Sequence, residues 1–241
     1  MPLSQTSAHF AGAGAHLGGN RTVRAARRDQ LARMSRCDNS TVSAIPSRTR
    51  PVGLAIWLIL AGVIGWWAAF QLMLEKLHVL ENPGASATCD FSVLVQCSAN
   101  LDSPQGSIFG FPNPILGLAA WVAPIVVGFA ILAGARVANW FWWCFALGML
   151  GGFVLVVWLI VQSIFVLGTL CPWCMVTWSV MIPSFYAVII HLFRSGALPV
   201  GSGARRGAQR LMGWLPLMTV LSFVVIAVVA QLRLDVIGNI F

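Results

Sequence analysis

Five long stretches of the 241-residue chain are apolar on every side, with neither a helical nor an alternating polar pattern. A hydrocarbon core of about 30 Å needs about 20 such residues for each α-helical span. Transmembrane β-strands are shorter and alternate apolar with polar side chains. The pattern therefore predicts an all-α integral membrane protein with five transmembrane helices, at residues 52–74, 114–133, 140–167, 172–193 and 211–232.

The composition supports a membrane protein, because 58% of the residues are hydrophobic and only 9% are charged. Residues 1–50 differ: they are rich in Ala, Arg, Ser and Gly without a sustained apolar run, which predicts a disordered cytoplasmic tail. The first span is too long for a signal peptide and is expected to stay as an anchor. We expect residues 194–210 to form a basic cytoplasmic loop, and residues 211–241 to form the fifth span with a short outer tail.

The distribution of charge predicts the orientation of the spans, since cytoplasmic segments retain Lys and Arg. With the N-terminus inside, 13 of the 15 basic residues fall on the cytoplasmic side and five of the seven acidic residues fall outside. The net charge of +8 therefore indicates a multi-pass cell-membrane protein with a cytoplasmic N-terminus. The basic residues flank the spans or lie in the tail and form no folded basic face, which argues against a nucleic-acid partner.

This topology sorts the six cysteines into two groups. Cys37 lies in the cytoplasmic tail and Cys144 lies early in the third span, so we expect neither to take part in redox chemistry. The remaining four fall on the outer side, where thiols can be oxidised and disulfides persist. They form two pairs, of which the first is Cys89 with Cys97 in the long outer loop at residues 75–113.

The second pair belongs to a Cys-Pro-Trp-Cys motif, Cys171 and Cys174, at the outer mouth of the fourth span. Cysteines at this spacing in the first turn of a helix can form a small disulfide, and the unpaired backbone N–H groups there stabilise a thiolate. Pro172 suits the first position of a helix. At headgroup level this pair can meet a lipid-soluble quinone from one side and a loop thiol from the other.

Other kinds of site fit less well. Cys89 and Cys97 taken alone are compatible with a structural disulfide. A four-cysteine zinc site would require a closed hydrophilic knuckle, and covalent haem would require a histidine where Met175 stands. A transporter would place ionisable residues within its spans, whereas the main polar groups here are Gln162 and hydroxyl residues, for which we expect a role in helix packing.

The order and spacing of these features resemble the vitamin K epoxide reductase family, specifically its bacterial members that oxidise thiols, over residues 52–193. The features are the outer-loop cysteine pair, a serine six residues later, a Phe-Gly-Phe-Pro-Asn segment at 109–113 and the Cys-Pro-Trp-Cys motif. The resemblance implies a four-helix catalytic bundle around a quinone, capped by the outer loop, with the fifth helix outside it. Many bacterial relatives carry a fused thioredoxin-like domain, and this chain stops at Phe241, so we expect the partner to be a separate protein.

By this resemblance, Cys174 faces the quinone, Cys171 exchanges with Cys97, and Cys89 meets the external partner. Four cysteines allow two successive thiol–disulfide exchanges, each with an attacking thiolate and an accessible disulfide.

Three more residues are implied in the quinone site. Ser103 and Asn113 would contact a quinone carbonyl or brace the cap, and a role in a turn or at the start of a helix is the alternative for both. Trp178 stands four residues after the second motif cysteine, where family members often have tyrosine, and its indole N–H can donate a hydrogen bond.

The resulting functional prediction is a membrane thiol:quinone oxidoreductase. It would reoxidise an extracytoplasmic DsbA-like or thioredoxin-like protein and reduce ubiquinone or menaquinone, supporting disulfide formation in exported proteins. The alternatives are a reductase of vitamin K epoxide or quinone that serves another pathway, and a non-enzymatic membrane scaffold with structural disulfides.

Overall fold

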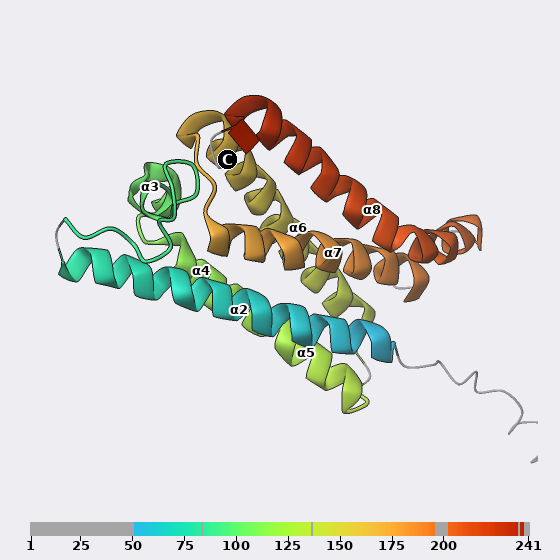
Figure 1. Cartoon of the computed structure of the whole chain (residues 1–241). Helices are drawn as coiled ribbons and strands as arrows, with labels where there is room; N and C mark the ends of the chain where they lie inside the picture. Colours follow the sequence, from blue (N-terminus) through green and yellow to red (C-terminus); the bar gives the residue numbers. More distant parts are fainter. Residues whose placement is uncertain (1–50, 83, 136, 196–201, 236, 239–241) are drawn as a thin grey trace, which may run out of the picture. The chain divides into compact units, whose positions relative to one another are not determined.

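Helices make up most of the described chain (Figure 1). The computed structural model describes residues 51–82, 84–135, 137–195, 202–235 and 237–238, and the predicted tail at 1–50 lies outside them. Two short turns accompany the helices, a 3-10 turn η1 (Pro104–Ser107) and a π-helical turn η2 (Ser163–Leu167). The helices are α2 (Val52–Glu81), α3 (Ser98–Asp102), α4 (Asn113–Ala120), α5 (Val122–Leu132), α6 (Asn139–Gln162), α7 (Pro172–Ser195) and α8 (Ser202–Leu234).

Within the described residues, five helical segments are long and apolar enough to cross a membrane. They are α2, α4 with α5, α6 with η2, α7, and the part of α8 from Arg206 onward. The prediction of an all-α protein with five spans is confirmed. Two boundaries differ from the predicted ones by more than two residues, because α2 continues to Glu81 and α8 already begins at Ser202, inside the segment expected to be a loop.

Helix α7 connects the bundle, since it packs against α2, α6 and α8, while α2 also packs against α4 and α5 (Figure 1). Leu58 of α2 and Val188 of α7 are completely buried. A hydrogen bond of 3.0 Å from Trp57 Nε1 to Ser184 Oγ joins the same two helices. Such interhelical bonds stabilise a membrane bundle by about 0.6 kcal/mol on average. Helix α8 lies against α7 and η2 and leaves most of its surface exposed.

The segment between α2 and α4, residues 84–112, is called the cap here. The last turns of α2, beyond the predicted end of the first span, fix it in place. Glu75 accepts hydrogen bonds from the backbone N–H of Thr88, at 2.9 Å, and from its hydroxyl. Lys76 Nζ lies 2.8 Å from Asp102 Oδ1 and donates to the carbonyl oxygen of Leu101 at 3.0 Å. The cap is therefore attached to the bundle by polar contacts from the extended part of α2.

The close packing of α2 against α4 and α5 depends on small residues. A Cβ atom at Gly65 would overlap the indole ring of Trp121. We expect Gly65→Val to lower the free energy of unfolding by about 1–3 kcal/mol or more, because the indole would have to move. Thermal unfolding in detergent measures the effect. Gly151→Val is the matched control, since a Cβ at Gly151 meets open space; equal melting temperatures of the two variants would contradict the prediction.

Candidate functional site

The four predicted site cysteines come together at the cap end of the bundle. Cys89 and Cys97 form a disulfide, and Cys97 Sγ lies 3.5 Å from Cys171 Sγ. The backbone N–H of Cys174 donates to Cys171 Sγ at 3.4 Å. The sulfur atoms therefore follow one another in the order 89, 97, 171 and 174, from the cap to the first turn of α7.

A break between α6 and α7 brings Cys171 to this position. Helix α6 passes into the π-helical turn η2, a type of turn frequent at functional sites. Gly168 then adopts a φ of +68°, a left-handed conformation that suits glycine and ends the turn. Ser163 Oγ donates to the carbonyl oxygen of Thr169, which keeps that polar group satisfied. Pro172 opens α7, so that Cys171 directly precedes the helix.

The extended residues before Cys171 pair with the residues before Cys97. The backbone N–H of Leu170 donates to the carbonyl oxygen of Leu94 at 2.7 Å, and that of Gln96 donates to Leu170 at 3.1 Å. These bonds form a parallel bridge between Val95 and Leu170. The pairing aligns the two segments and sets the two sulfur atoms opposite each other.

Asp90 fixes the loop that carries the first cysteine pair. Its carboxylate accepts hydrogen bonds from the backbone N–H of Cys97 at 2.7 Å, and from the N–H and hydroxyl of Ser98 at 3.1 and 2.6 Å. Burial raises the pKa of Asp90, but the hydrogen bond from the Ser98 hydroxyl and those from backbone N–H groups together outweigh it and lower the pKa. The ionised carboxylate is thus the form that holds the loop.

Cys171 is fully buried and is one of the free cysteines. The hydrogen bond from the Cys174 thiol lowers the pKa of the Cys171 thiol, although burial opposes it, and the backbone N–H groups of Cys174 and Trp173 lower it further. Donors of this kind at a helix N-terminus stabilise a thiolate. Cys171 is therefore suited to leave as a thiolate in thiol–disulfide exchange.

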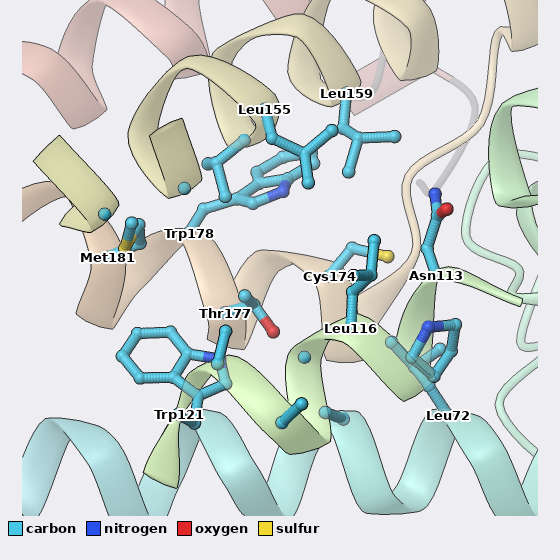
Figure 2. A pocket seen from close by; sticks show the side chains of 18 of the residues that line it. Leu72, Asn113, Leu116, Trp121, Leu155, Leu159, Cys174, Thr177, Trp178 and Met181 are labelled. Atoms are coloured by element: carbon cyan, nitrogen blue, oxygen red, sulfur yellow. The ribbon is translucent and has the colours of Figure 1, made fainter. Parts of the chain in front are cut away.

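A cavity of about 770 Å³ lies beneath the cap, between α4 and α5 on one side and α6 on the other, and residues of α2 and α7 also line it. Figure 2 shows the Cys174 sulfur exposed to this space, with Leu155 and Leu159 of α6 facing Leu116 of α4 across it. The walls are mostly apolar. The side chains with polar groups are Asn100, Ser103, Gln105, Asn113, Trp121, Cys144, Gln162, Cys174, Thr177 and Trp178.

Ser103 and Asn113 both line the cavity, and their polar atoms bind the cap. Ser103 Oγ donates to the carbonyl oxygen of Asn100 at 2.8 Å. Asn113 Nδ2 donates to the carbonyl oxygen of Gln105 at 2.6 Å, and its Oδ1 accepts from the N–H of Ile108 at 3.2 Å. Of the two roles expected for these side chains, the structure displays bracing of the cap.

Trp178 is 5% exposed and also lines the cavity. Figure 2 shows its indole extending from α7 toward Leu155. Within the described residues its indole N–H has no hydrogen-bond partner, so it is available to a ligand. Cys144 of α6 is a free thiol that also lines the cavity, and Cys37 lies outside the described residues.

Two further cavity residues were not predicted as site residues. Gln105 of η1 and Gln162 at the end of α6 meet through a hydrogen bond of 3.4 Å from Gln105 Nε2 to Gln162 Oε1. Gln105 Oε1 is buried and has no hydrogen-bond partner in the described part of the chain. The sequence signal for this pair is the polar amide of Gln162 within an apolar span, for which the sequence predicts a role in helix packing. The described residues contain no group of three or more His, Cys, Asp or Glu side chains placed to hold a metal ion.

A family model described as the Vitamin K epoxide reductase family matches residues 56–189, which is more than half of the chain. The matched region contains all four site cysteines, the cap and nearly all of the cavity. No curated protein matches the chain.

The contact of Cys97 with Cys171 predicts a specific cross-link. In the double variant Cys89→Ser with Cys174→Ser, mild oxidation should join residues 97 and 171, because their sulfur atoms already lie 3.5 Å apart. Mass spectrometry of the digested protein identifies the linked peptides. The control variant Cys89→Ser with Cys171→Ser leaves Cys97 and Cys174 and should cross-link several times more slowly. Equal yields would contradict the predicted order of the sulfur atoms.

The lowered pKa of Asp90 predicts that the stability of the cap depends on pH. Because its pKa is lowered in the folded protein, its contribution is present above the ordinary pKa of an aspartate and is lost as the pH falls through the lowered value, below about pH 4. Asp90→Asn should loosen the cap by about 1–3 kcal/mol at neutral pH, since charged acceptors make the stronger bonds.

The measurement is the rate at which a mild reductant opens the Cys89–Cys97 disulfide near neutral pH, which we expect to rise roughly 10-fold or more in Asp90→Asn. Asp235→Asn, after the end of α8, is a control for the loss of one carboxylate. An unchanged rate in Asp90→Asn would show that the carboxylate does not hold the loop.

Proposed function

The chain belongs to the vitamin K epoxide reductase family, which makes it a membrane oxidoreductase of the thiol and quinone kind, and we propose a specific reaction for it. It oxidises the dithiol of an extracytoplasmic DsbA-like or thioredoxin-like protein and passes the electrons to a quinone, ubiquinone or menaquinone, in the bilayer. Partner dithiol and quinone give partner disulfide and quinol.

One observation carries this proposal, namely the contact between Cys97 and Cys171. It connects a disulfide in the cap to a cysteine pair whose second member lines an apolar cavity. A scaffold with structural disulfides has no need of two free thiols beside a buried disulfide. Thiol–disulfide exchange does need a free thiol beside a disulfide, because the attacking and attacked sulfur atoms must meet.

The exchanges can be written for the side chains present. A partner thiolate attacks Cys89 and releases Cys97, and the second partner thiol then releases Cys89, leaving the partner oxidised. The Cys97 thiolate attacks Cys171 of a Cys171–Cys174 disulfide and releases Cys174. Cys89 then attacks Cys97 and releases Cys171, whose lowered pKa makes it a good leaving group.

The arrangement in the structure corresponds to the product of this sequence, with the cap disulfide formed and Cys171 and Cys174 both free. When bound, a quinone would supply the acceptor for two electrons and two protons from this pair. Cys174 is the member that lines the cavity and would face it.

The cavity suits a quinone in size and chemistry. Its volume of about 770 Å³ is within the usual range for small-molecule sites, and apolar walls with a few polar groups are typical of them. The unpaired N–H of Trp178 would donate to a ring oxygen. Ser103 and Asn113 would act by holding the cap over the ligand.

We further propose that the cap end of the bundle faces outward. Arg194 at the end of α7, and Arg206 and Arg210 in the first turns of α8, lie at the ends of their helices away from the cysteines. Positive residues retained on the cytoplasmic side would then leave the cysteines in the oxidising compartment.

Access of the partner requires movement of the cap. Cys89 is 4% exposed and Cys97 is completely buried, so a protein thiol cannot reach the disulfide in the observed arrangement. Attack on Cys89 therefore takes place when the cap opens around it.

The test uses purified full-length protein, a reduced thioredoxin-like protein and a water-soluble quinone. We expect quinol to form in proportion to the dithiol oxidised, and Cys→Ser at position 89, 97, 171 or 174 to reduce the rate at least 100-fold. Cys37→Ser is the control and should retain the rate. Partner oxidation at the normal rate by Cys97→Ser protein would refute the relay.

Two further outcomes identify the alternative functions. Turnover of vitamin K epoxide in place of quinone, found by product analysis, would indicate a reductase serving another pathway. Disulfides that resist mild reductants, with no spectral change on addition of quinone, would indicate a scaffold.

A further inference from the structure

Two glutamine side chains meet where the cap covers the cavity. Gln105 belongs to η1 of the cap and Gln162 is the last residue of α6. A single hydrogen bond of 3.4 Å joins their amides. Two amides joined in this way keep one carbonyl oxygen and one NH₂ group that do not bind each other. Both residues line the same cavity as Cys174.

The free carbonyl oxygen of this pair is buried without a partner. Gln105 Oε1 has no hydrogen bond to any described residue. An unsatisfied buried acceptor destabilises a fold and is uncommon in native proteins. A polar group of this kind, at the edge of an otherwise apolar cavity, indicates a missing hydrogen-bond donor.

The position of each glutamine directs its side chain to the ligand space. Leu155, Leu159 and Gln162 follow one face of α6 at spacings of four and three residues, and all three line the cavity. Asn113 Nδ2 donates to the carbonyl oxygen of Gln105 at 2.6 Å, and both Asn113 and Cys174 line the cavity (Figure 2). The cap thus presents Gln105 to the same cavity as the Cys174 thiol.

We propose that Gln105 and Gln162 position one ring oxygen of the quinone. This inference rests on the proposed function. The NH₂ group of the pair donates to a quinone carbonyl, and its free carbonyl oxygen accepts from the hydroxyl of the quinol. An amide pair can therefore bind the ligand before and after it takes up two electrons and two protons. Ser103 and Asn113 use their polar atoms to brace the cap, so they are positioning residues of the cap itself.

The experiment compares two flat ring ligands that carry the same four methyl groups, of which only one has ring oxygens. These are duroquinone and durene, its tetramethylbenzene counterpart. Their dissociation constants are measured by calorimetry or by competition on full-length protein in detergent. The variants are Gln105→Leu and Gln162→Leu, on two different elements, and Gln231→Leu on α8 is the matched control, because Gln231 does not line the cavity.

Wild-type protein should prefer duroquinone to durene. Gln105→Leu and Gln162→Leu should each reduce that preference by about 3- to 10-fold, the effect of one net hydrogen bond, while Gln231→Leu leaves it unchanged. A purely structural role would change the affinity for both ligands together.

Oxidation of the Cys171 and Cys174 thiols by duroquinone in the wild-type protein is measured in parallel. If the wild-type thiols are oxidised but the preference persists in both variants, the assignment of the glutamines is overturned and the proposed function stands. Wild-type protein that neither binds duroquinone nor becomes oxidised by it would overturn both.

Discussion

The approach of the Cys97 and Cys171 sulfur atoms to 3.5 Å is the contact on which the site depends. Both residues follow irregular backbone next to the membrane spans, where unpaired N–H and carbonyl groups are costly. The two segments satisfy each other through the bonds of Leu170 to Leu94 and of Gln96 to Leu170. The pairing that satisfies the backbone therefore also sets the distance between the sulfur atoms.

The same cysteines form the core of the cap. Cys89, Cys97 and Cys171 are buried together with Leu72 and Leu101, so the reactive sulfur atoms take the place that aliphatic side chains hold in an ordinary small core. The polar contacts from the last turns of α2 then attach this core to the bundle. A cap this small, with little apolar surface to bury, needs both the disulfide and these contacts to stay ordered.

The spans and the Cys-Pro-Trp-Cys pair could be recognised from the sequence, because a run of apolar residues and a two-residue gap between cysteines are local features. The order of the four cysteines came only from the resemblance to a family. The extension of α2 could not be predicted from local features. Glu75 and Lys76 indicated the end of a span, yet their partners Thr88 and Asp102 lie 13 and 26 residues further along the chain. The pairing of Gln162 with Gln105 could not be predicted for a related reason, because the two residues lie 57 positions apart and an amide in a span suits helix packing as well as a ligand.

Burial of the cap disulfide has opposite effects on the two exchanges of the proposed reaction. Exclusion of water favours exchange between Cys97 and Cys171, but it also keeps a protein partner away from Cys89, which is 4% exposed. In the proposed reaction the two exchanges would therefore belong to different arrangements of the cap, one closed over the internal transfer and one open to the partner. Cys174 lines the cavity beneath the cap, so the proposed route to the bilayer would run from Cys89 through Cys97 and Cys171 to Cys174.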